Sequence, residues 1–165
     1  MKDSRMYSQG GYKMIRTASK AIIIQNGCLL AIKMHDSGED FYVLPGGGQE
    51  NGENLHANLQ RECLEEIGVP VEIGSLLFVR DYIGSNHGYE PHAGQHQVEF
   101  FFACFIQDGG SPASGSIPDK NQVGIEWLPL KELADCPLFP APIRELIIRH
   151  ADGETGLPVY MGDVN

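Results

Sequence analysis

The sequence predicts an α+β domain in which strands and two principal helices pack in layers. Short runs of β-branched and aromatic residues, bounded by Gly, Asn and Pro, recur along the chain and indicate strands. Two segments, residues 54–68 and 142–150, carry apolar residues at the spacing of a helix. With 165 residues, of which 42% are hydrophobic and 21% charged, the chain is long enough to bury one core. These observations together favour a single layered domain.

The first half of the chain is expected to begin with a β-hairpin. Residues 22–24 are a run of isoleucines, and Asn26-Gly27 is a strong signal for a two-residue turn. The elements expected before the first helix are a strand over 14–25, a strand over 28–34, a turn at 37–40, a short strand over 41–44 and a glycine-rich loop over 45–48.

The first helix is expected over residues 54–68. Asn54 is a suitable N-cap residue, and Gly68 followed by Pro70 is a typical helix stop. One side of this helix is apolar and the other is acidic, which is the pattern of a helix packed on a core. The apolar side consists of Leu59, Cys63, Leu64 and Ile67, and the acidic side consists of Glu62, Glu65 and Glu66.

The second half of the chain alternates strands with loops and ends in a second helix. The Gly, Ser and Pro content of residues 108–121 indicates an exposed connection, and Pro142 suits the first turn of a helix. The elements expected here are one or two strands over 69–83 with a break near Gly74, a polar loop over 84–95, a long strand over 97–106, a strand over 123–128, a short helix over 130–134, a helix over 142–150 and a tail without a clear pattern over 153–165.

Charge and composition narrow the classes of function. A net charge of −10 argues against binding to a nucleic-acid backbone, and it would repel a bare polyphosphate unless divalent cations accompany it. The sequence contains no apolar segment long enough to predict a membrane span. The start of the chain lacks the apolar stretch of a signal peptide. We therefore expect a cytoplasmic protein. Four cysteines without a C-x-x-C pair indicate free thiols rather than disulfides or structural zinc.

Three glutamates on the first helix indicate a metal site. Glu62, Glu65 and Glu66 stand at positions i, i+3 and i+4, so like charges share one helix face and repel by a few tenths of a kcal/mol per pair. A divalent cation would reverse the sign of that interaction, and carboxylate oxygens are ligands that Mg2+ and Mn2+ prefer. The alternative is a solvated acidic face. The glycine loop just before the helix adds independent support for a ligand site, because glycine allows the backbone to approach a phosphate closely.

The spacing of this segment resembles the signature of the Nudix hydrolases. It reads Gly47-x5-Glu53-x7-Arg61-Glu62-x2-Glu65-Glu66-x-Gly68, and the soft departure is a cysteine at position 63, where an aliphatic residue is commoner. The strand-like residues 41–44 and 98–102 on either side also resemble the family. The resemblance implies the Nudix fold, a mixed β-sheet between α-helices, over residues 15–150, with an N-terminal segment at 1–14 and a C-terminal tail at 151–165.

Residue chemistry and the resemblance together assign roles at the site. Glu65 is our first choice for the general base, and Arg61 and Glu53 are expected to orient the other groups through charge-assisted bonds. The expected catalytic residues are Glu65, Glu62, Arg61 and Glu99. The expected metal ligands are Glu62, Glu65, Glu66, Glu99 and the carbonyl of Gly47. The expected substrate-binding residues are Arg16, Lys33, Arg80, Gly46 and Gly47.

The assignments outside the signature leave alternatives open. Glu99 lies in an otherwise apolar strand, where an unpaired carboxylate is costly, so it is either a metal ligand or base or a solvent-facing residue. The three cations are either phosphate contacts or solvated surface residues. His87, His92 and His96 fit no tight metal pattern, so they form either an ordinary polar loop or a substrate contact.

The expected function is hydrolysis of a phosphoanhydride bond with Mg2+, or alternatively Mn2+, as cofactor. The substrate would be a nucleoside diphosphate linked to another moiety, such as ADP-ribose or a nucleotide sugar, or a nucleoside triphosphate. The alternative is a nucleotide-sensing protein of the same fold without hydrolysis, against which the intact glutamates argue. An isoprenoid diphosphate isomerase shares the fold but would need a reactive cysteine, for which Cys104 is the candidate. We expect a small-molecule partner, no nucleic acid, no membrane and, by resemblance alone, a homodimer.

Overall fold

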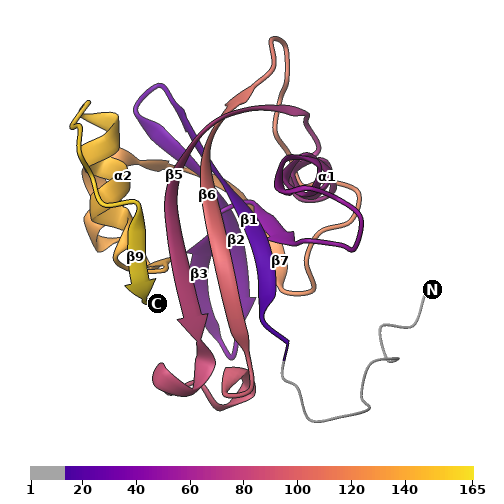
Figure 1. Cartoon of the computed structure of the whole chain (residues 1–165). Coiled ribbons are helices and arrows are strands. Elements are labelled where there is room, and N and C mark those ends of the chain that lie inside the picture. The colour runs from indigo at the N-terminus through magenta and orange to yellow at the C-terminus, as the bar shows by residue number, and fades with distance from the viewer. Residues whose placement is uncertain (1–13) are drawn as a thin grey trace.

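A curled mixed sheet lies between two helices. The computed structural model describes residues 14–165, with α1 (Leu55–Ile67) on one side of the sheet and α2 (Ile143–Ala151) on the other (Figure 1). The predicted fold class, a mixed sheet between helices, is confirmed. Most of the predicted N-terminal segment, residues 1–13, lies outside the described residues. Within residues 14–165, no helix combines the length and the apolar composition that a membrane crossing requires.

Nine strands among residues 14–165 form the sheet. Its order is β8-β3-β2-β1-β6-β5-β9, with β4 paired to β1 and β7 paired to β2. The central pair, β1 and β6, is parallel, as are the pairs β3–β8 and β5–β9. The strands are β1 (Arg16–Gln25), β2 (Cys28–Asp36), β3 (Glu39–Val43), β4 (Gly46–Gly48), β5 (Val71–Ile83), β6 (His96–Ile106), β7 (Gln122–Pro129), β8 (Leu138–Phe139) and β9 (Tyr160–Asp163).

The expected hairpin and the expected helix ends are present. Asn26 and Gly27 both have positive φ, 51° and 73°, which a two-residue turn of this hand requires, and Ile24 pairs with Leu29 across it. At the end of α1, Gly68 adopts the left-handed conformation with φ of 69°, and its N–H donates to the carbonyl of Cys63. Local sequence therefore determines these turns without help from distant parts of the chain.

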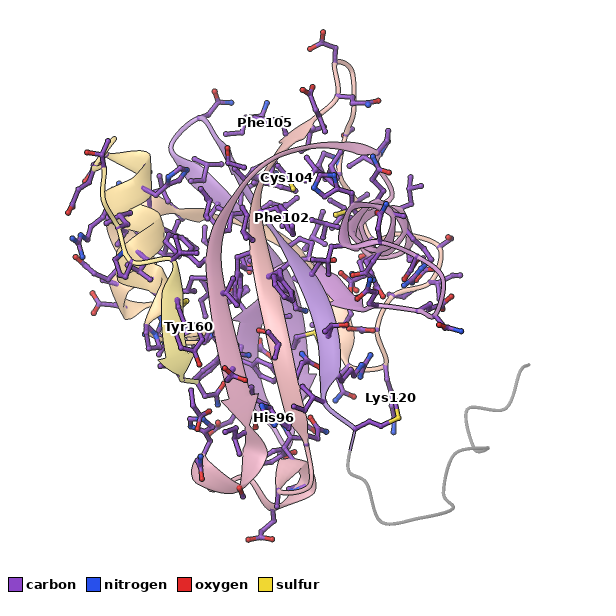
Figure 2. All side chains as sticks on the ribbon, in the orientation of Figure 1. His96, Phe102, Cys104, Phe105, Lys120 and Tyr160 are labelled. Atoms are coloured by element: carbon purple, nitrogen blue, oxygen red, sulfur yellow. The ribbon has the colours of Figure 1, made fainter. Side chains whose placement is uncertain are left out.

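Two hydrophobic clusters cover the two faces of the sheet. On one face, Ile143 and Ile147 of α2 pack with Phe78 and Phe101 of the central strands. A second cluster lies between the sheet and α1, where Phe102 and Cys104 of β6 (Figure 2) meet Leu59, Cys63 and Ile67. Successive residues of a strand point to opposite faces, so the central strands contribute to both clusters.

Several elements differ from the sequence-based expectation. Of the one or two strands expected over 69–83, the structure has one, β5, and the expected break near Gly74 is a shift of register between Ile73 and Leu76. The tail, which shows no pattern in the sequence, contributes β9 beside β5. The polar loop 84–95 contains two single turns of 3-10 helix, Gly84–Asn86 and Glu90–His92. The short helix expected over 130–134 is a 3-10 helix, Leu130–Asp135. β4 and β8 are too short to carry an alternating pattern.

Gly46 gives a test of how tightly β4 packs on β1. Its φ is +129°, and a Cβ at this position would lie 2.1 Å from the carbonyl oxygen of Ser19. Gly52 also has a positive φ, +92°, but nothing lies within 4 Å of its Cβ position. We expect Gly46→Ala to lower the free energy of unfolding by more than the ~1–3 kcal/mol of backbone strain that Gly52→Ala shares. Urea denaturation of both variants measures the difference, and equal losses would contradict the close packing.

Candidate active site

The glycine loop is held against the central strand. Ala18, Ser19 and Lys20 of β1 pair with Gly48, Gly47 and Gly46 of β4, in that order. Flanking backbone bonds extend this pairing, from the N–H of Ala21 to the carbonyl of Pro45 at 2.8 Å and from the N–H of Gln49 to the carbonyl of Thr17 at 2.9 Å. Three consecutive glycines allow such close contact because they have no Cβ. The glycine loop is therefore a fixed part of the sheet.

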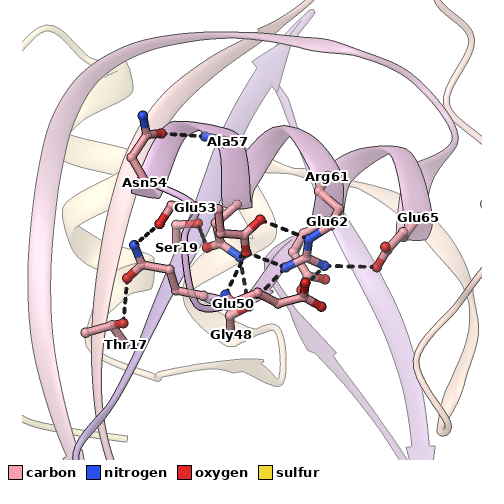
Figure 3. Close-up of polar contacts among 12 residues, drawn as sticks. Thr17, Ser19, Gly48, Glu50, Glu53, Asn54, Ala57, Arg61, Glu62 and Glu65 are labelled. Atoms are coloured by element: carbon pink, nitrogen blue, oxygen red, sulfur yellow. Dashed lines mark hydrogen bonds and ion pairs between the residues drawn. The ribbon is translucent and has the colours of Figure 1, made fainter. Parts of the chain in front are cut away.

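Asn58 joins the loop, the sheet and the start of α1. This buried side chain donates from Nδ2 to the carbonyl of Gly48 at 2.8 Å and accepts a hydrogen bond from the hydroxyl of Ser19. One turn earlier, the Oδ1 of Asn54 accepts from the N–H of Ala57 at 2.9 Å, which is the N-cap expected from the sequence. Figure 3 shows the contact between Asn54 and Ala57 at the N-terminal end of the helix. Asn58 was not among the residues predicted from the sequence.

Arg61 is the central cation of the site (Figure 3). Its guanidinium contacts both oxygens of Glu53, at 2.7 Å from Nη2 and 3.2 Å from Nε, and Nη2 also donates to the carbonyl of Gly48 at 3.1 Å. From Nη1 it reaches Glu62 Oε1 at 3.0 Å and Glu65 Oε2 at 3.3 Å. The bond from Arg61 lowers the pKa of Glu53 to about 2. This geometry suits the orienting role expected for Arg61 and Glu53.

Glu62 and Glu66 face the glycine loop from α1. A Cβ added to Gly47 would lie 2.7 Å from the carboxyl carbon of Glu62, so that carboxylate lies directly against the loop backbone. Glu66 is 2% exposed, and its Oε2 accepts the N–H of Gly46 at 2.8 Å. Burial raises the pKa of Glu62 and raises that of Glu66 to about 8. A bound cation would favour the charged form of both carboxyl groups.

The oxygen donors of this site fit a hard divalent cation. The carboxylates of Glu62, Glu65 and Glu66 and the carbonyl of Gly47 are all oxygen ligands, which suit Mg2+ or Mn2+ better than a softer metal. Within residues 14–165, no three His, Cys, Asp or Glu side chains already converge on one point, because Arg61 holds oxygens of Glu62 and Glu65. An ion that takes few protein ligands and completes its shell with water and phosphate oxygens fits this arrangement.

Two cations of β1 lie at the glycine loop. Arg16, predicted as a substrate-binding residue, places its guanidinium against Gly48, where an added Cβ would lie 2.1 Å from Nη2. Lys20 donates from Nζ to the carbonyl of Gly46 at 2.7 Å. Its charge also acts on the carboxyl groups of Glu62 and Glu66. Sequence reasoning missed Lys20, although a lysine inside a run of apolar strand residues was a signal for it.

Arg80 and Glu99, predicted as a phosphate contact and as a metal ligand or base, form a buried ion pair with each other. They pair across β5 and β6, with Arg80 Nε 2.5 Å from Glu99 Oε2. The second oxygen of Glu99 accepts from Gln97 at 2.7 Å, and Arg80 Nη1 donates to the carbonyl of Val164 at 2.6 Å. Burial acts to raise the pKa of Glu99, but the charges of Arg80 and Lys20 outweigh it and hold the pKa below its ordinary value. Both side chains thus have partners within the protein, and their roles in phosphate and metal binding stay predictions.

Lys33 and the three loop histidines also have partners within the protein. Lys33 forms an ion pair with Asp40 of β3 at 3.2 Å, and its role in substrate binding stays a prediction. The partners of the histidines are Asp163 for His87 at 2.7 Å, the hydroxyl of Tyr82 for His92 at 3.1 Å and Asp81 for His96 at 2.8 Å. These contacts favour the interpretation of residues 84–95 as a structural polar loop.

Cys104 does not have the properties of a nucleophile. It is 2% exposed, and burial raises its pKa to about 12, so the reactive thiolate is scarce at neutral pH. The geometry therefore argues against the isomerase alternative. All four cysteines are free thiols, as the sequence indicated.

The comparison with known families identifies the family that the fold and the signature suggest. Residues 14–150 match the family model for the NUDIX domain. The chain belongs to the Nudix hydrolase family. The resemblance seen in the sequence is thereby confirmed, and Nudix hydrolases generally use divalent metal ions.

Proteins similar to this Nudix chain come from several organisms. It is 30% identical over 113 residues to Nucleoside diphosphate-linked moiety X motif 6 of Xenopus laevis, covering 67% of this chain and 48% of that relative, so it spans about half the relative's length. The MutT Nudix hydrolase of Burkholderia pseudomallei is 26% identical with a TM-score of 0.64, covering 82% of this chain and 97% of that one. An ADP-ribose pyrophosphatase of Streptococcus suis has a TM-score of 0.61 at 18% identity, covering 91% and 100%, and shows the shared fold alone.

The buried ion pair gives a prediction that separates a structural role from a catalytic one. Arg80→Met leaves the Glu99 carboxylate buried without its cation, so we expect the free energy of unfolding to fall by about 3 kcal/mol. The double variant Arg80→Met/Glu99→Met should recover part of this loss, because no unpaired charge then remains. The control is Lys131→Met, which removes an ion pair whose side chains are 82% and 64% exposed. Urea denaturation that finds equal losses for Arg80→Met and the control would contradict the assignment.

Proposed function

We propose that this chain hydrolyses a phosphoanhydride bond of a nucleoside diphosphate linked to another moiety, with Mg2+ as its cofactor and Mn2+ as an alternative. The observation that carries the proposal is the contact between the glycine loop and the acidic side of α1. There, the half-buried carboxylate of Glu62 lies against Gly47 and the buried carboxylate of Glu66 lies against Gly46, while Arg61 fixes the neighbouring glutamates. Such an arrangement suits a metal-bound polyphosphate.

The metal would be held by Glu62, Glu65 and Glu66 together with the carbonyl of Gly47. When bound, it would neutralise charge on the phosphates and lower the pKa of a water molecule. Glu66 is suited to a fixed ligand, because it is buried and already oriented by the N–H of Gly46. Glu62 occupies a similar position against the loop.

Glu65 remains our candidate for the general base. Its side chain is 28% exposed, against 13% for Glu62, so water can reach it more easily. The 3.3 Å contact with Arg61 is the longest that this guanidinium makes to a carboxylate, and it leaves the other oxygen of Glu65 open to accept a proton. Arg16 and Lys20 lie at the glycine loop, where their charges would help to hold substrate phosphates. Gly46 and Gly47 would approach the substrate through their backbone.

The substrate class is inferred from relatives as well as from the site. The Xenopus relative is named for a nucleoside diphosphate-linked moiety, and one structural neighbour is an ADP-ribose pyrophosphatase. These names support ADP-ribose or another nucleotide sugar, with a nucleoside triphosphate as second choice. The net charge of −10 supports a small-molecule partner rather than a nucleic acid. A cytoplasmic location and a homodimer remain predictions.

A second candidate function is nucleotide sensing without hydrolysis. The observation that favours it is that Arg61 holds oxygens of Glu62 and Glu65, so no three acidic side chains converge in residues 14–165. A catalytic site needs these glutamates to turn toward the metal when it binds. A sensor could bind the nucleotide with Arg61 in place.

Glutamine variants distinguish the two functions. With Mg2+ and a panel of nucleotide sugars, dinucleotides and nucleoside triphosphates, we expect Glu65→Gln to lower kcat by roughly 100-fold and to change KM little. Glu66→Gln should abolish Mg2+-dependent turnover in a protein that remains folded. Glu72→Gln, on the exposed part of β5, serves as the control. Mass spectrometry of the products measures turnover. A wild-type protein that binds Mn2+ but hydrolyses nothing in the panel would favour the sensor. Full activity of a folded Glu66→Gln variant would contradict the metal assignment.

A further inference from the structure

The connection between β6 and β7 binds the C-terminal end of α1. The sequence predicts an exposed loop for residues 108–121, but three of its backbone N–H groups face the helix. Ala113, Gly115 and Ile117 donate to the carbonyls of Ile67, Glu66 and Glu65 at 3.0, 3.0 and 3.1 Å, respectively. We call residues 113–122 the strap. Figure 1 shows it as the orange segment that passes beside α1.

The pattern of these bonds shows that the strap wraps around the helix end. Every second residue of the strap donates, and the acceptors are consecutive residues of α1 in reverse order. Successive carbonyls of a helix are about 100° apart around its axis. Donors that meet three of them in turn must follow the circumference of the last turn. The strap therefore supplies partners for backbone carbonyls that the end of a helix otherwise leaves unpaired.

Glu66 is fixed from both its backbone and its side chain. Its carbonyl accepts from Gly115 at 3.0 Å and also from the Nε2 of Gln122 at 3.0 Å. Its carboxylate accepts the N–H of Gly46 from the glycine loop at 2.8 Å. The strap and the glycine loop thus hold this residue from two sides.

Position 115 requires glycine for reasons of space. A Cβ there would lie 2.1 Å from the carbonyl oxygen of Glu65 and 2.8 Å from that of Leu64. Its φ lies outside the left-handed region, so the contact and not the backbone conformation excludes a larger residue. The backbone of the strap at Gly115 therefore lies in direct contact with the backbone of the helix.

We infer that the strap is a positioning element of the metal site, an inference that rests on the proposed function. Two forces loosen the last turn of α1: repulsion among Glu62, Glu65 and Glu66, and the negative end of the helix dipole close to two of them. Four donors on the carbonyls of Glu65, Glu66 and Ile67 offset both. With that turn fixed, the side chain of Glu66 stays on the glycine loop, and that of Glu65 stays beside Arg61.

The test compares two glycine variants of the full chain. Gly115→Ala must push the strap away from α1, whereas Gly124→Ala on β7 meets nothing within 4 Å of its new Cβ. We expect Gly115→Ala to bind Mn2+ about ten-fold more weakly than wild type, as is typical when the groups that orient metal ligands are altered. Gly124→Ala should bind as wild type does. Electron paramagnetic resonance of free Mn2+ measures both affinities without any substrate.

Two further variants keep the inference falsifiable. Gln122→Met removes one donor to Glu66 at nearly constant volume, and it should weaken Mn2+ binding several-fold even if Gly115→Ala does not fold. Asn54→Ala removes the N-cap at the opposite end of α1 and should leave Mn2+ affinity unchanged despite lower stability. Wild-type affinity in Gly115→Ala and Gln122→Met, or an equal loss in Asn54→Ala, would overturn the role of the strap alone. A wild-type chain that binds no Mn2+ would overturn the proposed function as well.

Discussion

The guanidinium of Arg61 is the interaction on which the rest of the site depends. The chain carries a net charge of −10, yet it gathers Glu53, Glu62 and Glu65 around one point of α1. Arg61 makes this stable because a planar guanidinium can serve several carboxylates and a carbonyl at once. Lysine, a single point charge, could not replace it. The same guanidinium also ties the helix to the glycine loop through Gly48, so it fixes both halves of the site relative to each other.

The sheet supplies a rigid base for this arrangement. β1 is paired on both edges, with β6 on one side and β4 on the other, and it carries Arg16 and Lys20 to the glycine loop. The strap holds the far end of α1, and Asn58 holds its near end. The carboxylates therefore stand on a helix fixed at both ends, which is what a preorganised metal site requires. The backbone that carries these carboxylates is therefore positioned before any ligand arrives.

Sequence alone predicts those features that depend on neighbouring residues. The turn at Asn26-Gly27, the cap at Asn54 and the stop at Gly68 follow from local chemistry, and the signature residues identify the family. Contacts between distant segments could not be predicted. Arg80 has its partners at Glu99 and Val164, and the strap meets α1 only after the chain has folded. β4 and β9 carry no alternating pattern that could predict them. They are strands because each pairs with a neighbouring strand from a distant part of the chain. The site assignments remain predictions.

The most direct test of the account is the position of a bound metal ion. Anomalous scattering from a crystal soaked in Mn2+ locates that ion independently of any enzyme assay. We predict a peak between α1 and the glycine loop, at about 2.0–2.3 Å from carboxylate oxygens of Glu62 and Glu66, since Mn2+ bonds are slightly longer than those of Mg2+. The same map should show Glu65 turned away from Arg61. No peak at the glycine loop, or a peak whose protein ligands all lie outside α1 and that loop, would contradict the account.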